Sequence, residues 1–196
     1  MRLSDREFKG MNNAFRSFIQ RRVEFPLFQG MGLTQRGLDM LEIGCGSGYG
    51  ATLLARLEPT SYTGIDLMPE QIALALKRNL PGAVFRVQDA TDLSDIPDAS
   101  KDVVVVFGVL HHIPPWRAVL DEVYRVLRPG GRLFIEEPDG GAITFFDCLF
   151  HWGHPGGFRL KEFEAYLEAI GFTICQRRRI FVGFATYCVQ KPPTAA

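Results

Sequence analysis

Residues 41–48 read Leu-Glu-Ile-Gly-Cys-Gly-Ser-Gly, and this stretch decides the fold. Residues 38–43, Leu-Asp-Met-Leu-Glu-Ile, predict a strand, and residues 48–57 predict a helix. Glycines between a strand and a helix allow a tight turn and a close approach of the backbone to a nucleotide-like ligand. We therefore expect a ligand-binding loop at the carboxyl end of the first strand of a sheet.

The rest of the chain continues as alternating strands and helices. Strands are expected at 62–66, 83–88, 102–107 and 132–137, and helices at 69–80, 116–127 and 161–170. This alternation predicts an α/β fold with a doubly wound, mostly parallel sheet. Two further strands, expected at 172–178 and 181–189, predict an antiparallel edge.

The two ends of the chain differ from the middle in composition. The formal net charge is zero, but residues 1–36 carry seven basic and three acidic groups, whereas residues 37–144 carry nine and fifteen. Five of the sixteen phenylalanines lie in 1–28, and eight lie in 145–184. We expect residues 1–36 to form an N-terminal helical lid segment on a domain of residues 37–196. Within that domain, residues 143–160 are expected to be an insertion on the substrate side.

The spacing of apolar residues predicts a lid helix over 12–23 that ends at Pro26. We expect Phe15, Phe18 and Ile19 to face inward, and residues 143–158, including Phe158, to supply the opposite wall of an acceptor pocket. An equally open alternative is that these phenylalanines pack the appendages onto the core or form a dimer face.

Several absences narrow the class of protein. The first residues contain no apolar run of the kind found in signal peptides, and the apolar stretch 103–110 is too short to span a membrane. The four cysteines form no Cys-x-x-Cys pair, so we expect reduced thiols in a cytoplasmic protein. Zero net charge makes nucleic acid an unlikely partner, and we expect a monomer or a homodimer.

Three kinds of ligand-binding protein use a glycine loop between a strand and a helix. A P-loop is excluded because no Gly-Lys-Ser/Thr follows it. The run from Gly46 to Ala51 fits a dinucleotide fingerprint, with Asp66 20 residues beyond Gly46. However, Glu42 precedes the first glycine, where it would repel a pyrophosphate and attract a cation. With Asp66 and Asp89 after the next two strands, the carboxylates predict a nucleoside that bears positive charge.

Five ordered motifs between residues 35 and 138 resemble class I S-adenosylmethionine-dependent methyltransferases of the small-molecule branch. They are Leu-Glu-Ile-Gly-Cys-Gly-Ser-Gly at 41–48, Gly-Ile-Asp at 64–66, Gln-Asp-Ala at 88–90, Phe-Gly-Val-Leu-His-His at 107–112 and Arg-Val-Leu-Arg-Pro-Gly-Gly at 125–131. The resemblance implies a Rossmann-like sheet of seven strands with an antiparallel edge strand. It also implies S-adenosylmethionine as cofactor and S-adenosylhomocysteine as product.

Site residues follow from the resemblance, position by position. Gly44, Cys45, Gly46 and Gly48 would line the methionine part, with Glu42 beside them. Asp66 would hold the ribose, Leu67 and Met68 would lie beside the adenine, Asp89 and Ala90 would hold the adenine edge, and Phe107 and Gly108 would lie against the sulfonium. Alternatively, Asp66 and Asp89 are helix caps or solvated loop residues.

Methyl transfer needs a base only if the acceptor must lose a proton. His111 and His112 follow the fourth predicted strand and are candidates for a base or an orienting group. Glu136, Glu137 and Asp139 end the fifth strand, where one of them is a candidate for orienting an acceptor, but the favoured interpretation is that they are solvated loop residues. His151 and His154, with Asp147 upstream, are interpreted as part of a substrate-facing loop and not as metal ligands, so we expect no metal.

Three functions are compatible with these patterns. The first is methyl transfer from S-adenosylmethionine to a small, apolar or aromatic acceptor. The second is an NAD(P)-dependent oxidoreductase, which is disfavoured by Glu42 and by the lack of a catalytic Tyr-Lys or His-Asp pattern. The third is a non-catalytic adenosine-ligand binding protein on the same fold.

Overall fold

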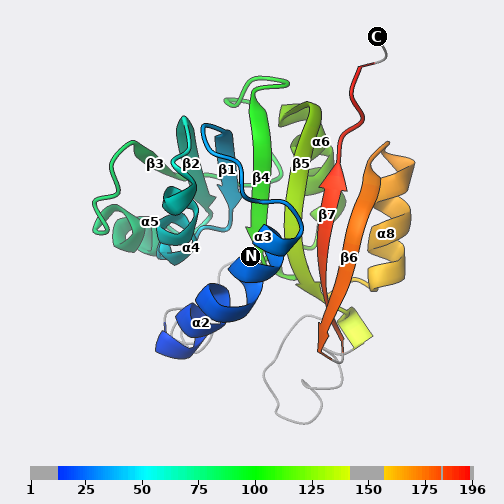
Figure 1. The fold of residues 1–196 in the computed structure, drawn as a ribbon, viewed down its shortest axis with the longest axis horizontal. Helices are drawn as coiled ribbons and strands as arrows, with labels where there is room; N and C mark the ends of the chain where they lie inside the picture. The colour runs from blue at the N-terminus through cyan, green and yellow to red at the C-terminus, as the bar shows by residue number, and fades with distance from the viewer. Residues whose placement is uncertain (1–12, 142–156, 182, 195–196) are drawn as a thin grey trace.

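The computed structural model of the protein describes residues 13–141, 157–181 and 183–194. Seven strands form one sheet in the order β3-β2-β1-β4-β5-β7-β6 (Figure 1). Their bounds are β1 Asp39–Ile43, β2 Ser61–Asp66, β3 Ala83–Val87, β4 Lys101–Phe107, β5 Leu127–Pro138, β6 Thr173–Phe181 and β7 Phe184–Gln190. The first five strands run parallel, and β7 is antiparallel to both β5 and β6. The predicted doubly wound sheet with an antiparallel edge is therefore confirmed.

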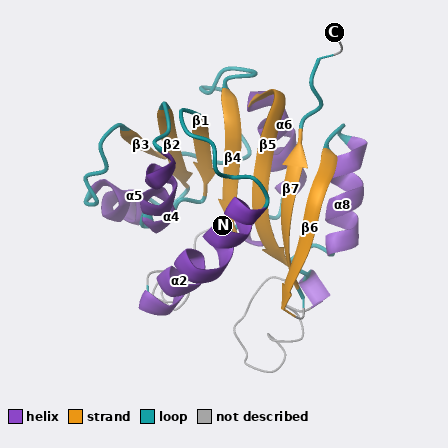
Figure 2. Cartoon of the chain, viewed as in Figure 1, coloured by secondary structure: helices purple, strands orange, loops and turns teal. Residues whose placement is uncertain are grey.

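The helices lie against both faces of this central layer of strands (Figure 2). Their bounds are α2 Ala14–Ile19, α3 Phe25–Gly30, α4 Tyr49–Leu54, α5 Pro69–Leu76, α6 Trp116–Val126 and α8 Leu160–Ala169, with shorter turns η1 Gln20–Glu24, η2 Ala55–Leu57 and η3 Leu110–His112. One buried cluster joins the sheet to α6 and α8, and a second joins it to α3 and α4. Within the described part of the chain, no helix has the length and apolar character needed to cross a membrane.

Strand β4 shows why the sheet forms here. Its residues 103–106 are four consecutive valines, and all are buried. A β-branched side chain is suited to a pleated strand, and a strand buried on both faces is apolar at every position. The carboxyl ends of β1, β2 and β4 consequently meet at one edge of the sheet, beside the N-terminal helical segment (Figure 1).

The N-terminal helical segment differs from the expectation in one respect. The helix does not end at Pro26, because a π-helical turn, η1, connects α2 directly to α3. Pro26 lies in the first turn of α3, where its missing N–H is least disruptive. Phe25 and Phe28 of α3 are buried, and the Phe28 ring lies 5.2 Å from that of Phe107. The division into a lid at 1–36 and a domain at 37–196 stays a prediction.

Two of the predicted inward-facing phenylalanines point the other way. Phe15 is 71% exposed and Phe18 is 55% exposed, so the expectation that they line a pocket is wrong. The side of this segment that faces the cavity carries Arg16 of α2 and Gln20 of η1 instead. Phe158, expected in the opposite wall, packs in the core 4.8 Å from the Trp116 ring. The remaining wall residues expected at 143–156 lie outside the described residues.

Candidate functional site

A cavity of about 250 Å³ opens at the edge where the parallel strands end. It is bounded by the glycine loop, by the ends of β2, β3 and β4 and by one side of α2. The predicted site residues in its wall are Gly44, Cys45, Gly46, Asp66, Leu67, Met68, Asp89, Ala90, Phe107 and His112. The structure thus brings together residues separated by up to 68 positions in the chain. Glu42, Gly48, Gly108 and His111 are outside this wall.

The glycine loop has the backbone that the sequence predicts. Gly44 has φ of 66° and Gly46 has φ of 52°, a region that residues with a Cβ rarely adopt. A Cβ on Gly44 would lie 2.7 Å from the Val109 side chain, so the loop and the end of β4 meet only because this residue is glycine. A Cβ on Gly46 would lie 3.9 Å from its nearest neighbour, Oε1 of Gln71, so the loop is open toward the cavity at this residue.

Asp66 is fixed at the end of β2 by two backbone groups. Gly46 and Met68 each donate an N–H to the carboxylate, both at 2.9 Å. Burial raises the pKa of this carboxyl group. A carboxylate has about four acceptor positions, so Asp66 keeps capacity for the hydroxyl groups of a ligand. Its position in the cavity wall fits the expected ribose contact.

Asp89 lies at the end of β3 and bonds to its own turn. Its Oδ1 accepts the Thr91 backbone N–H at 2.9 Å and the Thr91 hydroxyl at 2.8 Å. This bonding within its own turn matches the alternative expectation that Asp89 is a loop residue. Asp89 nevertheless also lines the cavity. Ala90 is buried beside it. The adenine contact of Asp89 stays a prediction.

Glu42 lies behind the cavity and not in it. Side chains alternate along a strand, so Leu41 and Ile43 point to one face of the sheet while Glu42 points to the other. There Glu42 is 1% exposed and accepts a hydrogen bond from the Tyr62 hydroxyl. Burial raises its pKa to about 8. The expectation that its carboxylate faces a ligand does not match this geometry, and the electrostatic argument against a pyrophosphate fails with it.

The buried Glu42 carboxyl group makes stability depend on pH. Because its folded-state pKa is about 8 and its ordinary value is 4.5, the folded state binds more protons between these values. The free energy of unfolding therefore falls as the pH rises through this window, by roughly 1 kcal/mol per pH unit. Glu42→Gln keeps an acceptor for Tyr62 but cannot ionise. The part of the pH dependence of the free energy of unfolding that comes from Glu42 is therefore expected to be absent from this variant.

Urea unfolding of both proteins at pH 5, 6.5 and 8 measures the effect. The difference in free energy of unfolding should shift in favour of Glu42→Gln as the pH rises. Burial also raises the pKa of Glu24 and Glu136, but both residues are present in the two proteins, so their contributions largely cancel in the difference. A difference that stays constant across this range would contradict the assignment.

Gly48 and Gly108 have structural positions next to the cavity wall. Gly48 has φ of 74° and precedes α4, where a Cβ would lie 3.0 Å from that of Ala75. Gly108 has φ of 58°, and a Cβ there would lie 2.8 Å from Oε2 of Glu136. Both positions therefore require glycine, although neither residue contributes to the wall itself.

The two candidate histidines occupy different places. His112 is 8% exposed and lines the cavity. His111 directs Nδ1 to Oε2 of Glu137 at 2.7 Å. The two imidazole rings pack with their centroids 4.2 Å apart. His111 is thus anchored to the sheet, and His112 is the one in contact with the cavity.

Glu137 organises the chain after β4. Its carboxylate accepts the backbone N–H groups of Val109, Leu110 and His111 at 3.1, 2.7 and 3.2 Å. The side chain is fully buried, and Glu136 is 5% exposed. The interpretation of Glu136 and Glu137 as solvated loop residues is therefore wrong. Both residues lie within β5, as the strand expected at 132–137 implies, and their side chains are buried.

Arg16 and Gln71 are among the cavity residues that the sequence did not predict. Arg16 of α2 donates to the Phe107 carbonyl oxygen at 3.2 Å and pairs with Glu24 at 2.5 Å. Gln71 in the first turns of α5 is 2% exposed, and its Oε1 has no hydrogen-bond partner among the described residues. Pro69, which starts α5 just after β2, was the signal that could have directed attention to Gln71.

Cys45 is a buried residue of the cavity wall. Burial raises the pKa of the Cys45 thiol far above its usual range, so the thiol is held neutral. Cys45, Cys175 and Cys188 are free thiols, and Cys148 lies outside the described residues. Among residues 13–141, 157–181 and 183–194, no three His, Cys, Asp or Glu side chains form a group suited to a metal ion. His151 and His154 lie outside those ranges.

Comparison with known proteins agrees with this geometry. A family model described as a methyltransferase domain matches residues 41–135. A phthiotriol/phenolphthiotriol dimycocerosates methyltransferase of Mycobacterium leprae is 48% identical over 99 residues, which are 50% of this chain and 36% of the relative. A 2-methyl-6-phytyl-1,4-hydroquinone methyltransferase of Synechocystis is 30% identical over 173 residues, covering 80% of this chain and 54% of the relative.

The fold has equally clear counterparts. The crystal structure of a SAM dependent methyltransferase from Aquifex aeolicus superposes with a TM-score of 0.76 at 15% identity, covering 97% of this chain and 100% of that one. Sheet order, glycine loop and carboxylate-lined cavity define a Rossmann-like α/β protein that binds a nucleoside ligand. With the sequence matches, the chain belongs to the class I S-adenosylmethionine-dependent methyltransferases. The predicted family and its cofactor, S-adenosylmethionine, are confirmed. The chain spans about a third to a half of the two curated relatives.

Proposed function

We propose that this chain transfers a methyl group from S-adenosylmethionine to a small acceptor that is apolar or aromatic. One observation carries the proposal: a single cavity joins Asp66 and the glycine loop to an apolar end. The apolar end is formed by Phe107, Val109, Ile113, Pro114 and Pro115. A cavity of this composition favours an acceptor with a large apolar part and few polar groups.

The residues of the cofactor end fit S-adenosylmethionine. Asp66 is oriented by two backbone N–H groups and keeps acceptor capacity for ribose hydroxyls. Gln71 directs a buried oxygen without a described partner toward the loop, 3.9 Å from where a Cβ of Gly46 would stand. S-adenosylmethionine supplies a methyl carbon activated by a sulfonium. The carboxylates of Asp66 and Asp89 place negative charge near this cationic ligand.

The chain's own contribution to the reaction is mainly positioning. Holding an acceptor in line with the methyl carbon supplies up to roughly 7–11 kcal/mol of the reduction in barrier. We assign to His112, in the cavity wall, the role of taking a proton from an acceptor that must lose one. His111 acts as a positioning residue, because its ring packs on His112 and is held by Glu137.

Names of the relatives agree with a lipophilic acceptor. One refers to phthiotriol or phenolphthiotriol dimycocerosates, and the other to a hydroquinone that bears a phytyl group. Both names describe hydroxyl-bearing molecules with large apolar portions. For this chain we propose, in addition to the apolar or aromatic acceptor, a cytoplasmic location and a monomeric or homodimeric state.

Calorimetry separates the proposal from the oxidoreductase alternative. S-adenosylhomocysteine is expected to bind the full chain, and NAD is expected to show no measurable binding. Tight NAD binding without binding of S-adenosylhomocysteine would overturn the proposal. Transfer of a labelled methyl group to a panel of prenylated and unprenylated hydroquinones then tests for an enzyme. Binding of the cofactor with no transfer to any acceptor would favour a non-catalytic adenosine-ligand binding protein.

A further inference from the structure

Helix α2 exposes an aromatic and basic face beside the cavity. Phe15 and Phe18 are 71% and 55% exposed, and they lie three residues apart on one side of the helix. Arg21 and Arg22 lie in the following turn, η1, and are also exposed. Neither arginine forms an ion pair with a described residue. We call Phe15, Phe18, Arg21 and Arg22 the α2 face.

The orientation of this face is fixed by the opposite side of the helix. Arg16 donates to the Phe107 carbonyl oxygen at 3.2 Å and to Glu24 at 2.5 Å, with its side chain 17% exposed. Gln20, one turn later, lines the cavity. Rotating α2 to bury the two phenylalanines would break these contacts. The exposure of both rings is therefore a property of the folded domain.

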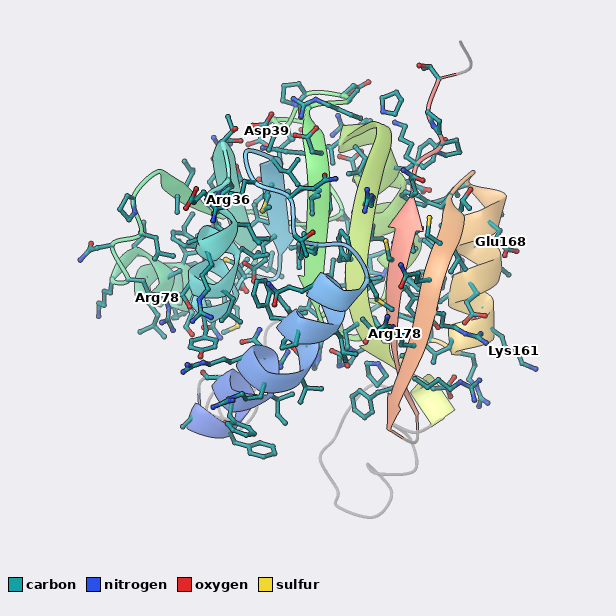
Figure 3. All side chains as sticks on the ribbon, in the orientation of Figure 1. Arg36, Asp39, Arg78, Lys161, Glu168 and Arg178 are labelled. Atoms are coloured by element: carbon teal, nitrogen blue, oxygen red, sulfur yellow. The ribbon has the colours of Figure 1, made fainter. Side chains whose placement is uncertain are left out.

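Two further arginines lie on β6, which reaches the end of α3. Arg178 of β6 donates to the carbonyl oxygen of Gly30 at the end of α3, at 3.1 Å, and Figure 3 shows its side chain near that helix. Arg179 is exposed and opposite Ala185, which in turn is opposite Glu137 near the carboxyl end of β5. Both arginines are thus near the edge of the sheet that bears the cavity. Residues 1–36 also carry four more basic than acidic groups.

We propose that the α2 face docks the protein onto an anionic lipid surface, with the cavity beside the bilayer. Aromatic side chains next to arginines on one helix face suit the membrane interface, where rings enter the acyl boundary and guanidinium groups meet phosphates. Arg16 and Gln20 would then border a route from the lipid to the apolar end of the cavity. Delivery of the acceptor by this route rests on the proposed function, whereas docking itself does not.

Vesicle co-sedimentation of the full chain tests the docking surface. Binding is expected to vesicles of phosphatidylcholine with 30% phosphatidylglycerol, and to be at least tenfold weaker to phosphatidylcholine alone or at 0.5 M salt. Phe15→Ser with Phe18→Ser should reduce binding at least tenfold. Arg21→Gln with Arg22→Gln should reduce it about 30-fold, since roughly 1 kcal/mol per arginine is about fivefold each. Leu76→Ser is the matched control, because Leu76 is also 55% exposed but lies on α5, and it should bind normally.

Other outcomes would overturn the docking proposal. They are absence of vesicle binding, or binding that the Phe15/Phe18 double variant leaves unchanged. A dimer in sedimentation velocity that the same variant dissociates, without vesicle binding, would assign the face to a second copy of the chain. Binding of S-adenosylhomocysteine should be unchanged in all these variants. If that binding is absent from the wild type while vesicle binding persists, the proposed function fails and the docking surface stands.

Discussion

Asp66→Ala is expected to weaken the binding of S-adenosylhomocysteine about 10- to 100-fold in calorimetry. The wild-type carboxylate is already held by Gly46 and Met68, so it presents its remaining lone pairs to a ligand without reorganisation. A hydrogen bond to a charged group contributes about 1.5–3 kcal/mol, which corresponds to this range of affinity. Alanine also leaves two backbone N–H groups at the loop without their acceptor, which loosens the Gly46 turn.

Two variants separate the ribose contact from a general loss of order. Asp66→Asn keeps one carbonyl oxygen and should lose less affinity than Asp66→Ala. Asp92→Ala removes a carboxylate that accepts the Ser94 backbone N–H at 3.1 Å in a similar turn, but Asp92 does not line the cavity. Its affinity for S-adenosylhomocysteine should equal that of the wild type. Unchanged affinity in Asp66→Ala would show that the ribose assignment is wrong.

The sequence was sufficient for features set by local backbone chemistry. Gly44 and Gly46 adopt positive φ in a turn between a strand and a helix, and such turns require glycine wherever they occur. Asp66 and Asp89 follow strand ends, and the ends of parallel strands share one edge of a sheet. Their presence in one cavity wall therefore follows from the order of the strands. The antiparallel β6–β7 pair was also predicted, although Phe181 ends β6 and does not begin β7.

Orientation of side chains was harder to predict, because it depends on distant contacts. Helical spacing placed Phe15 and Phe18 on one side of a helix, but spacing alone does not say which side faces the sheet. That choice is made by Arg16, whose partner Phe107 lies 91 residues away. The contact of a half-buried arginine can thus orient a helix so that its apolar side chains face away from the sheet.

Glu42 was misplaced for a different reason. Glu42 is close to the glycines in sequence, but side chains alternate along β1, so Glu42 points to the face of the sheet opposite Ile43. The same alternation separates Glu136 from Glu137 on β5. Glu136 lies against Gly108 on the face near α2, and Glu137 reaches the backbone of η3. Neighbouring side chains in a strand point to opposite faces of the sheet, so Glu136 and Glu137 are expected to differ in their surroundings. The expectation that both are loop residues did not include this difference.

Glu137→Ala is expected to destabilise the protein by about 3 kcal/mol or more. The substitution leaves the N–H groups of Val109, Leu110 and His111 and the Nδ1 of His111 without their acceptor in a buried place. Each unsatisfied buried donor costs about 1–3 kcal/mol, and water entering the space of the lost side chain recovers part of this. For a domain of this size the melting temperature should fall by roughly 6–12 °C.

Glu136→Gln provides a matched contrast on the neighbouring residue of the same strand. Burial and the nearby carboxylates of Glu24 and Glu137 raise the pKa of Glu136 well above its ordinary value. A neutral amide therefore replaces a group that already favours its neutral form, and stability should change little or rise. Glu137→Gln, in contrast, keeps only one acceptor oxygen where two carboxylate oxygens accept the backbone N–H groups of Val109, Leu110 and His111, so this variant should be destabilised. Equal melting temperatures for Glu136→Gln and Glu137→Gln would contradict the assignment.

The same variants distinguish stability from positioning of the cavity wall. Measured well below its melting temperature, Glu137→Gln should bind S-adenosylhomocysteine nearly as tightly as the wild type, because the carboxylate does not line the cofactor end. Its methyl-transfer kcat should fall about tenfold or more, since His111 and the backbone beneath His112 lose their fixed geometry. A variant that is less stable yet keeps the wild-type kcat would leave Glu137 with a structural role alone. That result would also remove the reason for placing His111 among the positioning residues.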